Sequence, residues 1–266
     1  MLLALYNQAG GPGWTNNTGW NGKPRTECGW YGVTCDAAGD HVVQLTVSNN
    51  NLVGTLPASW DLPALTSLSL GGNHLTGPLG SLAGAPLLEV VNACCNQLSG
   101  PLPPLAGQSQ LQYFYLQDNL IDGSIPDLAG LSHLMYFDVR HNALTGSLPS
   151  LSGLVALKNF KVANNALDGA LPSLSGLTAL QQFDVENNLL AGTVPSLSGT
   201  SLAFFRIGNN RLEGYLPGIP AGVFISSASL CPNRLQPVDD PAWDAATGTS
   251  PWWLPCDRLF AGDFDA

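Results

Sequence analysis

The sequence contains few charged residues and no long apolar run. Lys, Arg, Asp and Glu together make up 11% of the 266 residues, and 19 acidic side chains outnumber nine basic ones. Because binding to nucleic acid requires a concentrated basic surface, the net charge of −10 argues against a nucleic-acid partner. No apolar run approaches the roughly 18 residues that a membrane-spanning helix needs, so we expect no membrane span in this chain.

Side chains typical of catalysis are also scarce. None of the four histidines lies in a motif typical of a nucleophile or of a metal site. The sequence therefore predicts no metal site and no cofactor, and we expect a protein that is not an enzyme. The histidines are His41, His74, His133 and His141.

What the sequence has instead is an internal repeat that is marked by an asparagine. Segments such as FDVRHNAL and FDVENNLL align on this asparagine, and six consecutive steps between them are 23 residues long. One step of 22 residues follows, and one more of 23 completes a ladder of nine asparagines. Such a period is typical of a stack of similar structural units. The ladder consists of Asn50, Asn73, Asn96, Asn119, Asn142, Asn165, Asn188, Asn210 and Asn233.

Each repeat places apolar residues eight, five and three positions before its asparagine. The alternation predicts a short strand with one buried face, followed by a turn at the asparagine. The amide side chain can both donate and accept, so we expect it to point inward and bind backbone groups that lie away from water. A glycine follows four positions later, usually with a Leu-Pro pair, and this predicts a bend and then short return segments at 149–154 and 172–177.

The repeating unit LxxLxLxxNxLxGxLP resembles the leucine-rich repeat, and its Gly and Leu-Pro positions resemble the plant-type subclass. The resemblance covers 42–235, as an array of nine repeats, although the plant-type unit is generally one residue longer. It implies an α/β repeat solenoid, a horseshoe or superhelix that is mostly strand and coil. A parallel sheet would form the concave side, and short 3₁₀ or turn segments would form the convex side.

The segments on either side of the array read as caps that seal the ends of the stack. The N-terminal region, 1–41, contains a CxWxGVxC element that resembles the N-terminal cap of plant-type leucine-rich repeat proteins, which implies a Cys28–Cys35 disulfide. The C-terminal region, 236–266, is rich in tryptophan and ends in an acidic tail, and we expect a second disulfide between Cys231 and Cys256. Two disulfides imply an oxidising compartment, so we expect a secreted or cell-surface protein.

The C-terminal segments also resemble the endings of exported leucine-rich repeat proteins from proteobacteria, which implies a bacterial origin. Two cysteines remain outside the caps. Cys94 and Cys95 read either as two free thiols, as a vicinal disulfide, or as a soft-metal site with His74 that lacks a third convincing ligand.

The residues six, four and two positions before each asparagine should face outward from the concave sheet. Counted from seven positions before each asparagine to one after it, these strand segments hold six of the nine basic residues but only five of the 19 acidic residues, so the concave face should be nearly neutral. Tyrosine and arginine supply much of the energy at recognition surfaces, and we predict a partner-binding patch there. Its residues are Tyr113, Tyr115, Tyr136, Asp138, Arg140, Lys161, Asp184 and Arg206.

Two other interpretations apply to the charged members of this patch. Four of them alternate in sign on successive strands, and such charges can stabilise a sheet without any partner. Asp138 and Asp184 should also lie roughly 10 Å apart, close to the spacing in an inverting glycosidase. Lys161 between them should keep both carboxylates ionised, whereas a glycosidase needs one protonated acid.

The function that we expect is a secreted, non-enzymatic recognition protein, a monomer that binds a protein or a glycan on its concave sheet. The first alternative is the ectodomain of a cell-surface receptor or adhesin. The resemblance also permits ice binding, because some plant-type relatives bind ice, and two columns of convex serines would form that surface. These are Ser150, Ser173 and Ser196, with Ser152, Ser175 and Ser198.

Overall fold

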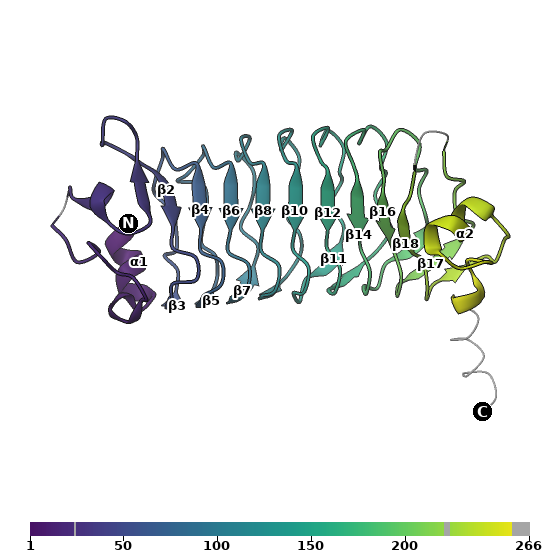
Figure 1. Ribbon diagram of the computed structural model, residues 1–266, viewed down its shortest axis with the longest axis horizontal. Helices are drawn as coiled ribbons and strands as arrows, with labels where there is room; N and C mark the ends of the chain where they lie inside the picture. The colour runs from purple at the N-terminus through teal and green to yellow at the C-terminus, as the bar shows by residue number, and fades with distance from the viewer. Residues whose placement is uncertain (24, 221–223, 257–266) are drawn as a thin grey trace, which may run out of the picture.

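A computed structural model describes residues 1–23, 25–220 and 224–256. The chain forms an elongated β-solenoid in which the repeats stack in sequence order from the N-terminus to the C-terminus (Figure 1). The predicted fold class is confirmed: a parallel sheet runs along the molecule, and helices are confined to its two ends. We number the coils 1 to 9 by their ladder asparagines, from Asn50 in coil 1 to Asn233 in coil 9.

The main sheet has ten strands in the described part of the chain. Nine are parallel and come from successive coils, while β1 (Val33–Cys35) pairs antiparallel with the first of them. Equivalent residues of neighbouring coils face each other in register, as Tyr113 and Tyr136 do. The parallel strands are β2 (Val42–Thr46), β4 (Ser67–Ser69), β6 (Val90–Asn92), β8 (Tyr113–Tyr115), β10 (Tyr136–Asp138), β12 (Asn159–Lys161), β14 (Gln182–Asp184), β16 (Phe204–Arg206) and β18 (Ser227–Ser229).

The core lies behind this sheet, because the middle residue of each short strand points inward. In coils 4 to 8 that residue is phenylalanine, and each ring is fully buried. The rings stack along the molecule with centroids 5.5 to 6.0 Å apart. One coil cannot bury such a ring by itself, so the stack depends on contact between neighbouring coils. The column consists of Phe114, Phe137, Phe160, Phe183 and Phe205.

The ladder asparagines lie beneath the turns and join the coils, as Asn142 illustrates. Its Nδ2 donates to the carbonyl oxygens of Leu116, Val139 and Arg140 at 3.0 to 3.2 Å. Its Oδ1 accepts from the N–H of Ile121 in the preceding coil at 2.9 Å. One side chain therefore satisfies backbone groups of two coils. The Oδ1 atoms of Asn73, Asn96, Asn119, Asn165, Asn188, Asn210 and Asn233 accept in the same way from the preceding coil.

After each asparagine the chain forms a second short strand, which the sequence analysis did not predict. These strands pair in parallel with those of neighbouring coils and form three smaller sheets. Extended backbone is favoured there because the adjacent coil supplies its hydrogen-bond partners; the N–H of Thr145 donates to the oxygen of Gly123 at 2.8 Å. The strands are β3 (Val53–Thr55), β5 (His74–Gly77), β7 (Gln97–Pro101), β9 (Leu120–Asp122), β11 (Thr145–Ser147), β13 (Ala166–Asp168), β15 (Ala191–Thr193), β17 (Arg211–Gly214) and β19 (Arg234–Leu235).

The return segments contain turns, and one detail of the prediction needs correction. Within the described residues the only 3₁₀ helices are η1 (Gly11–Gly13) and η2 (Glu27–Gly29), and both lie before the array. The segments 149–154 and 172–177 are loops and turns.

Both ends of the stack are covered. At the N-terminus, α1 (Leu2–Gln8) packs Leu2 and Leu5 inward, and Cys28 is bonded to Cys35. At the C-terminus, α2 (Pro241–Thr247) is capped by Asp240, whose carboxylate accepts from the N–H of Ala242, and the helix packs against β18. Two buried tryptophans, Trp243 and Trp252, and a Cys231–Cys256 disulfide hold this end. Most of the predicted acidic tail, 257–266, lies outside the described residues.

Candidate functional site

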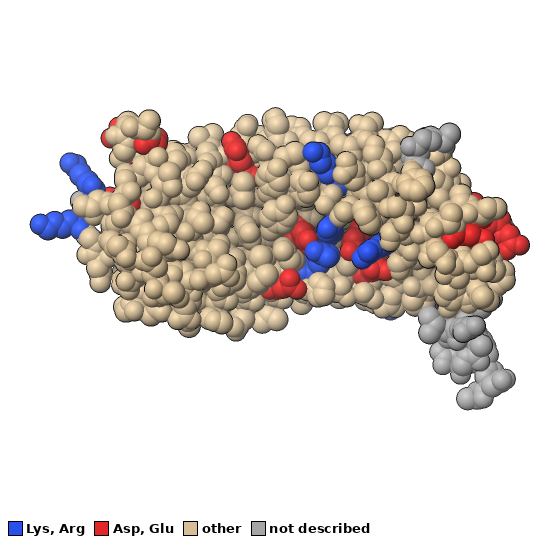
Figure 2. Space-filling model, viewed as in Figure 1, with Lys and Arg blue, Asp and Glu red and all other residues tan. Residues whose placement is uncertain are grey.

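The candidate site is on the outer face of the main sheet, which corresponds to the concave face of the prediction. The first and third residues of each short strand point to this side, because the middle residue points to the core. Figure 2 shows acidic and basic side chains gathered near the middle of this face, whereas the stretch between them and the charged N-terminal end of the molecule is almost free of charge. The charged cluster lies over β10, β12, β14 and β16, beside the tyrosines of β8 and β10.

Three tyrosines on two adjacent strands form an aromatic cluster. The rings of Tyr113 and Tyr136 face each other across β8 and β10, with centroids 5.2 Å apart and planes 13° apart. Tyr115 completes the cluster, with its ring 6.2 Å from that of Tyr113 and 6.4 Å from that of Tyr136. All three side chains are half-buried, and burial raises the pKa of Tyr115. The structure thus brings together the three tyrosines that the sequence singled out.

Next to this cluster, Asp138 is paired with Arg140 of its own coil. Arg140 Nη2 lies 2.8 Å from Asp138 Oδ2, and Arg140 Nε lies 2.9 Å from Asp138 Oδ1. The expected exposure of Asp138 was wrong, because only 6% of this residue is accessible to solvent. The sequence pattern placed both residues on the face but did not indicate that they bind each other.

The remaining charged residues lie in register without forming ion pairs. Lys161 stands between Asp138 and Asp184 on neighbouring strands, and Arg206 follows Asp184. In the described part of the chain, however, no ion pair joins Lys161 to either carboxylate or Arg206 to Asp184. The alternation in sign is therefore a feature of the register and supplies no direct salt bridge.

Burial changes the ionisation of this group. Asp184 is 8% exposed, and burial raises its pKa above the ordinary value in spite of the nearby guanidinium groups of Arg140 and Arg206. Burial, together with repulsion from Arg140, lowers the pKa of Lys161. The expectation that Lys161 holds Asp184 firmly ionised is thus opposed by desolvation.

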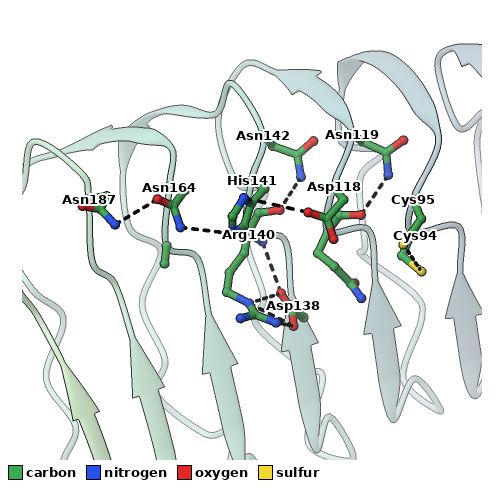
Figure 3. Close-up of polar contacts among 12 residues, drawn as sticks. Cys94, Cys95, Asp118, Asn119, Asp138, Arg140, His141, Asn142, Asn164 and Asn187 are labelled. Carbon is green, nitrogen blue, oxygen red and sulfur yellow. Dashed lines mark hydrogen bonds and ion pairs between the residues drawn. The ribbon is translucent and has the colours of Figure 1, made fainter. Parts of the chain in front are cut away.

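A polar row at the edge of this face was missed by the sequence analysis (Figure 3). Asn209 donates to Asn187 at 2.8 Å, and Asn187 donates to Asn164 at 2.9 Å. Asn164 Nδ2 lies 3.2 Å from His141 Nε2, and His141 Nδ1 lies 3.8 Å from Asp118 Oδ1. All five residues immediately precede a ladder asparagine and have positive φ, which explains why asparagine and aspartate recur there. The recurrence of asparagine and aspartate at this position was the signal in the sequence that could have revealed the row.

No metal centre and no spanning helix are found in the described residues. No three His, Cys, Asp or Glu side chains in residues 1–23, 25–220 and 224–256 are grouped so that they could hold a metal ion. Within the same residues, every helix is too short or too polar to cross a membrane. A cavity of about 740 Å³ lies between the N-terminal region and the first coils, lined in part by Arg25, His41 and Asp61, in a different part of the molecule from the tyrosines.

Comparison with known proteins identifies the fold. No protein-family model matches the chain, and no curated protein matches it significantly. Among solved structures, a TDR receptor aligns with a TM-score of 0.70 and 27% identity over 76% of this chain and 37% of that chain. The leucine-rich repeat ectodomain of the Arabidopsis receptor kinase HAESA, solved with a peptide hormone ligand, aligns with a TM-score of 0.54 and 24% identity over 88% of this chain and 49% of that one.

A third structure has nearly the same length as this chain. It is a plant ice-binding protein that aligns with a TM-score of 0.61 and 22% identity over 94% of this chain and 92% of its own. The chain therefore has the fold of a leucine-rich repeat solenoid like those of plant receptor ectodomains. It spans less than half the length of the two receptor chains.

Proposed function

We propose that this protein is a non-enzymatic recognition protein that binds a protein partner on the outer face of its main sheet. The observation that carries the proposal is the cluster of Tyr113, Tyr115 and Tyr136 on adjacent strands, next to the Asp138–Arg140 pair. The likeness to the HAESA ectodomain, which is solved with a peptide hormone ligand, supports a peptide or protein as the partner rather than a glycan.

The tyrosine cluster has the properties of a binding anchor. The rings are already held against one another, so little conformational freedom remains to be lost when a partner binds. Each ring offers an apolar body and a hydroxyl group, a combination that is enriched at interfaces. The strands beneath are fixed by the stack, so the patch is presented on a rigid surface.

The charged residues beside the tyrosines favour a partner that carries both signs of charge. Lys161 and Arg206 offer positive charge, and Glu186 in the neighbouring coil offers negative charge. Since Lys161 is half-buried and forms no salt bridge within the described residues, an acidic group on a partner would find its charge incompletely neutralised. Such complementarity gives specificity more than affinity.

Secretion or display at a cell surface fits this function, and the two disulfides support an extracellular setting. The alternative, a receptor ectodomain, would use the same binding face. It differs from a secreted protein only in being attached to further segments of a receptor. A bacterial origin stays a prediction.

The test is a double substitution in the tyrosine cluster. Partners are captured from the extracellular proteins of the host environment, and each purified partner is titrated by calorimetry with the wild type and with Tyr115→Ala combined with Tyr136→Ala. We expect loss of binding with little change in thermal unfolding. Tyr215→Ala is the matched control, because Tyr215 is 69% exposed and lies outside the main sheet. Full-strength binding by the double variant would refute the proposal, and binding of purified glycans in place of proteins would change the partner class.

Ice binding is retained as a second candidate on the strength of the convex serines. The hydroxyls of Ser150, Ser173 and Ser196 each accept from the N–H two residues later at 3.2 Å, which gives them a repeated orientation on three successive coils. A measurement of thermal hysteresis decides this candidate, with Ser152→Tyr, Ser175→Tyr and Ser198→Tyr combined as the variant that should abolish any activity.

A further inference from the structure

Two adjacent cysteines in coil 3 lie side by side on the surface of the molecule. The sulfur atoms of Cys94 and Cys95 are 3.2 Å apart and are not bonded to each other (Figure 3). Both residues lie in the turn between β6 and β7. Here the positive φ of Cys95, +59°, turns the chain so that both sulfur atoms lie together.

The conformation of Cys95 is one that cysteine has no special tendency to adopt. The corresponding residues of the neighbouring coils, Gly72 and Asp118, also have positive φ, but glycine and aspartate tolerate this region better than most residues. Cysteine has no such tolerance of positive φ. The stacking of the coils therefore imposes the conformation that brings the two thiols together.

The two thiols differ in their surroundings. Cys95 is exposed, whereas Cys94 is half-buried and lies against Gly71 of the preceding coil, where a Cβ atom would come within 3.3 Å of its sulfur. Burial, together with Cys95 and the carboxylates of Asp118 and Asp138, raises the pKa of Cys94 to about 12. Cys95 is thus the accessible thiol, and Cys94 is the one held behind it.

The backbone between the two residues is held on both sides. The oxygen of Cys94 accepts from the N–H of Gly72 and from Asn96 Nδ2, each at 3.0 Å. The N–H of Cys95 donates to the oxygen of Gln117 at 3.0 Å. These bonds belong to the stack itself, so they restrain the pair in either redox state.

We propose that Cys94 and Cys95 form a reversible dithiol–disulfide site that exchanges with low-molecular-weight disulfides of the glutathione type. This site is separate from the proposed binding function and does not depend on it. In the first step, the thiolate of Cys95 attacks one sulfur of glutathione disulfide, forms a mixed disulfide and releases one glutathione. In the second step, the sulfur of Cys94 loses its proton and attacks Cys95 Sγ, which closes the ring and releases the second glutathione.

The reaction transfers two electrons from the cysteine pair to glutathione disulfide. The two cysteines are oxidised to a disulfide, the glutathione disulfide is reduced to two glutathiones, and the two thiol protons pass to the glutathiones. Adjacent α-carbons are about 3.8 Å apart, less than the usual span of about 4.4–6.8 Å across a disulfide, so the bridge should be strained and easily reduced. We expect it to open under milder reducing conditions than the Cys28–Cys35 and Cys231–Cys256 bonds.

The experiment is a redox titration of the intact protein in glutathione buffers of graded ratio. Each sample is quenched with acid and alkylated with N-ethylmaleimide, and its mass and peptide map are recorded. We expect the reduced pair, which takes up two N-ethylmaleimide groups, to convert reversibly into a disulfide that takes up none and is two hydrogens lighter than the unlabelled dithiol. The other four cysteines should stay oxidised throughout. Stable glutathione adducts on the pair, or two alkylated thiols in the most oxidising buffer, would overturn the proposal.

Single substitutions test the order of the two steps. Cys94→Ser should stop at the mixed disulfide on Cys95, because the resolving thiol is absent. Cys95→Ser should react with glutathione disulfide roughly tenfold more slowly than Cys94→Ser, because only the half-buried thiol remains. Equal rates would contradict the roles given to the two thiols. Thermal unfolding of each variant checks its fold, and the titration of the wild type decides the proposal if a variant does not fold.

Discussion

The guanidinium of Arg140 lies against the carboxylate of Asp138, two residues earlier in the same coil, with two nitrogen–oxygen contacts of 2.8 and 2.9 Å. A carboxylate on the outer face of a sheet would normally be hydrated. Here it is nearly buried, and the arginine replaces the lost water with charge-assisted hydrogen bonds. Removal of one partner should therefore affect stability more than removal of both.

We predict that Arg140→Gln lowers the free energy of unfolding by about 1–3 kcal/mol, because it leaves a buried carboxylate without its partner. The combination of Arg140→Gln with Asp138→Asn should cost less than the sum of the two single changes. Urea unfolding of the four proteins in this cycle measures the coupling. Arg234→Gln, at an exposed arginine, is the control and should be nearly neutral. Additive effects would mean that the contact contributes nothing to stability.

A ladder asparagine should be far less replaceable than its exposed neighbours. Asn142→Leu removes three donated bonds and one accepted bond within and between coils. Each backbone group left unsatisfied should cost about 1–3 kcal/mol. Thermal unfolding measures the loss, and Gln110→Leu, at an exposed amide that donates to its neighbour Ser109, serves as the comparison. If the two variants unfold at the same temperature, the ladder does not hold the coils together.

The residue before each ladder asparagine is constrained by its backbone. Asn187 has a φ of +55° and is exposed, so its side chain is not needed in the core. Asn187→Val should destabilise the protein by about 1–2 kcal/mol, because a β-branched residue resists this conformation. Asn187→Gly should have a much smaller effect, although it also removes the contacts with Asn164 and Asn209. Denaturant unfolding compares the two, and a larger loss for glycine would show that the polar row outweighs the backbone.

The buried carboxylate of Asp184 should make stability depend on pH. Since burial raises its pKa in the folded state, the folded protein holds this proton more tightly than the unfolded chain. The contribution of Asp184 to stability is therefore greatest in acid and is lost as pH rises from the ordinary value of 3.8 through the raised one.

Asp184→Asn should accordingly be more stable than the wild type near neutral pH, with the difference vanishing in acid. The asparagine keeps an oxygen to accept from the N–H of Glu186, a bond of 3.4 Å in the wild type. Melting temperatures from about pH 3 to about pH 7 measure the effect. A variant that is less stable at neutral pH would mean that attraction to Arg140 and Arg206 exceeds the cost of burial.

The repeat alone was sufficient to predict the stack, because the asparagine and the apolar positions recur at a fixed period. The same period correctly placed the tyrosines of β8 and β10 on one face, since strand residues alternate in direction. It did not predict the second short strands, which follow the asparagine in each coil. Their sequences contain glycine and polar residues, and the backbone of the adjacent coil, not side-chain pattern, makes them extended.

The contacts and burial of the charged residues could not be predicted from the sequence for a different reason. Equivalent positions in successive repeats show which face a side chain lies on. They do not show which residue the end of a long side chain contacts. Arg140 was therefore assigned to the face without its contact to Asp138, and the burial of Asp138 and Asp184 was missed. The proximity of the two thiols of coil 3 depends on the sign of a single φ angle, which no apolar pattern records.

The antiparallel pairing of β1 with β2 has a consequence for how the protein can vary in length. A parallel sheet could accept another strand at a bare edge, but Val33 and Thr34 already occupy the hydrogen-bonding groups of β2 on that side, and α2 packs against β18 at the other. Growth by addition of units outside the ends is thereby blocked. New units can enter only between existing ones, and each would lengthen the outer face by about 4.8 Å while leaving both termini as they are.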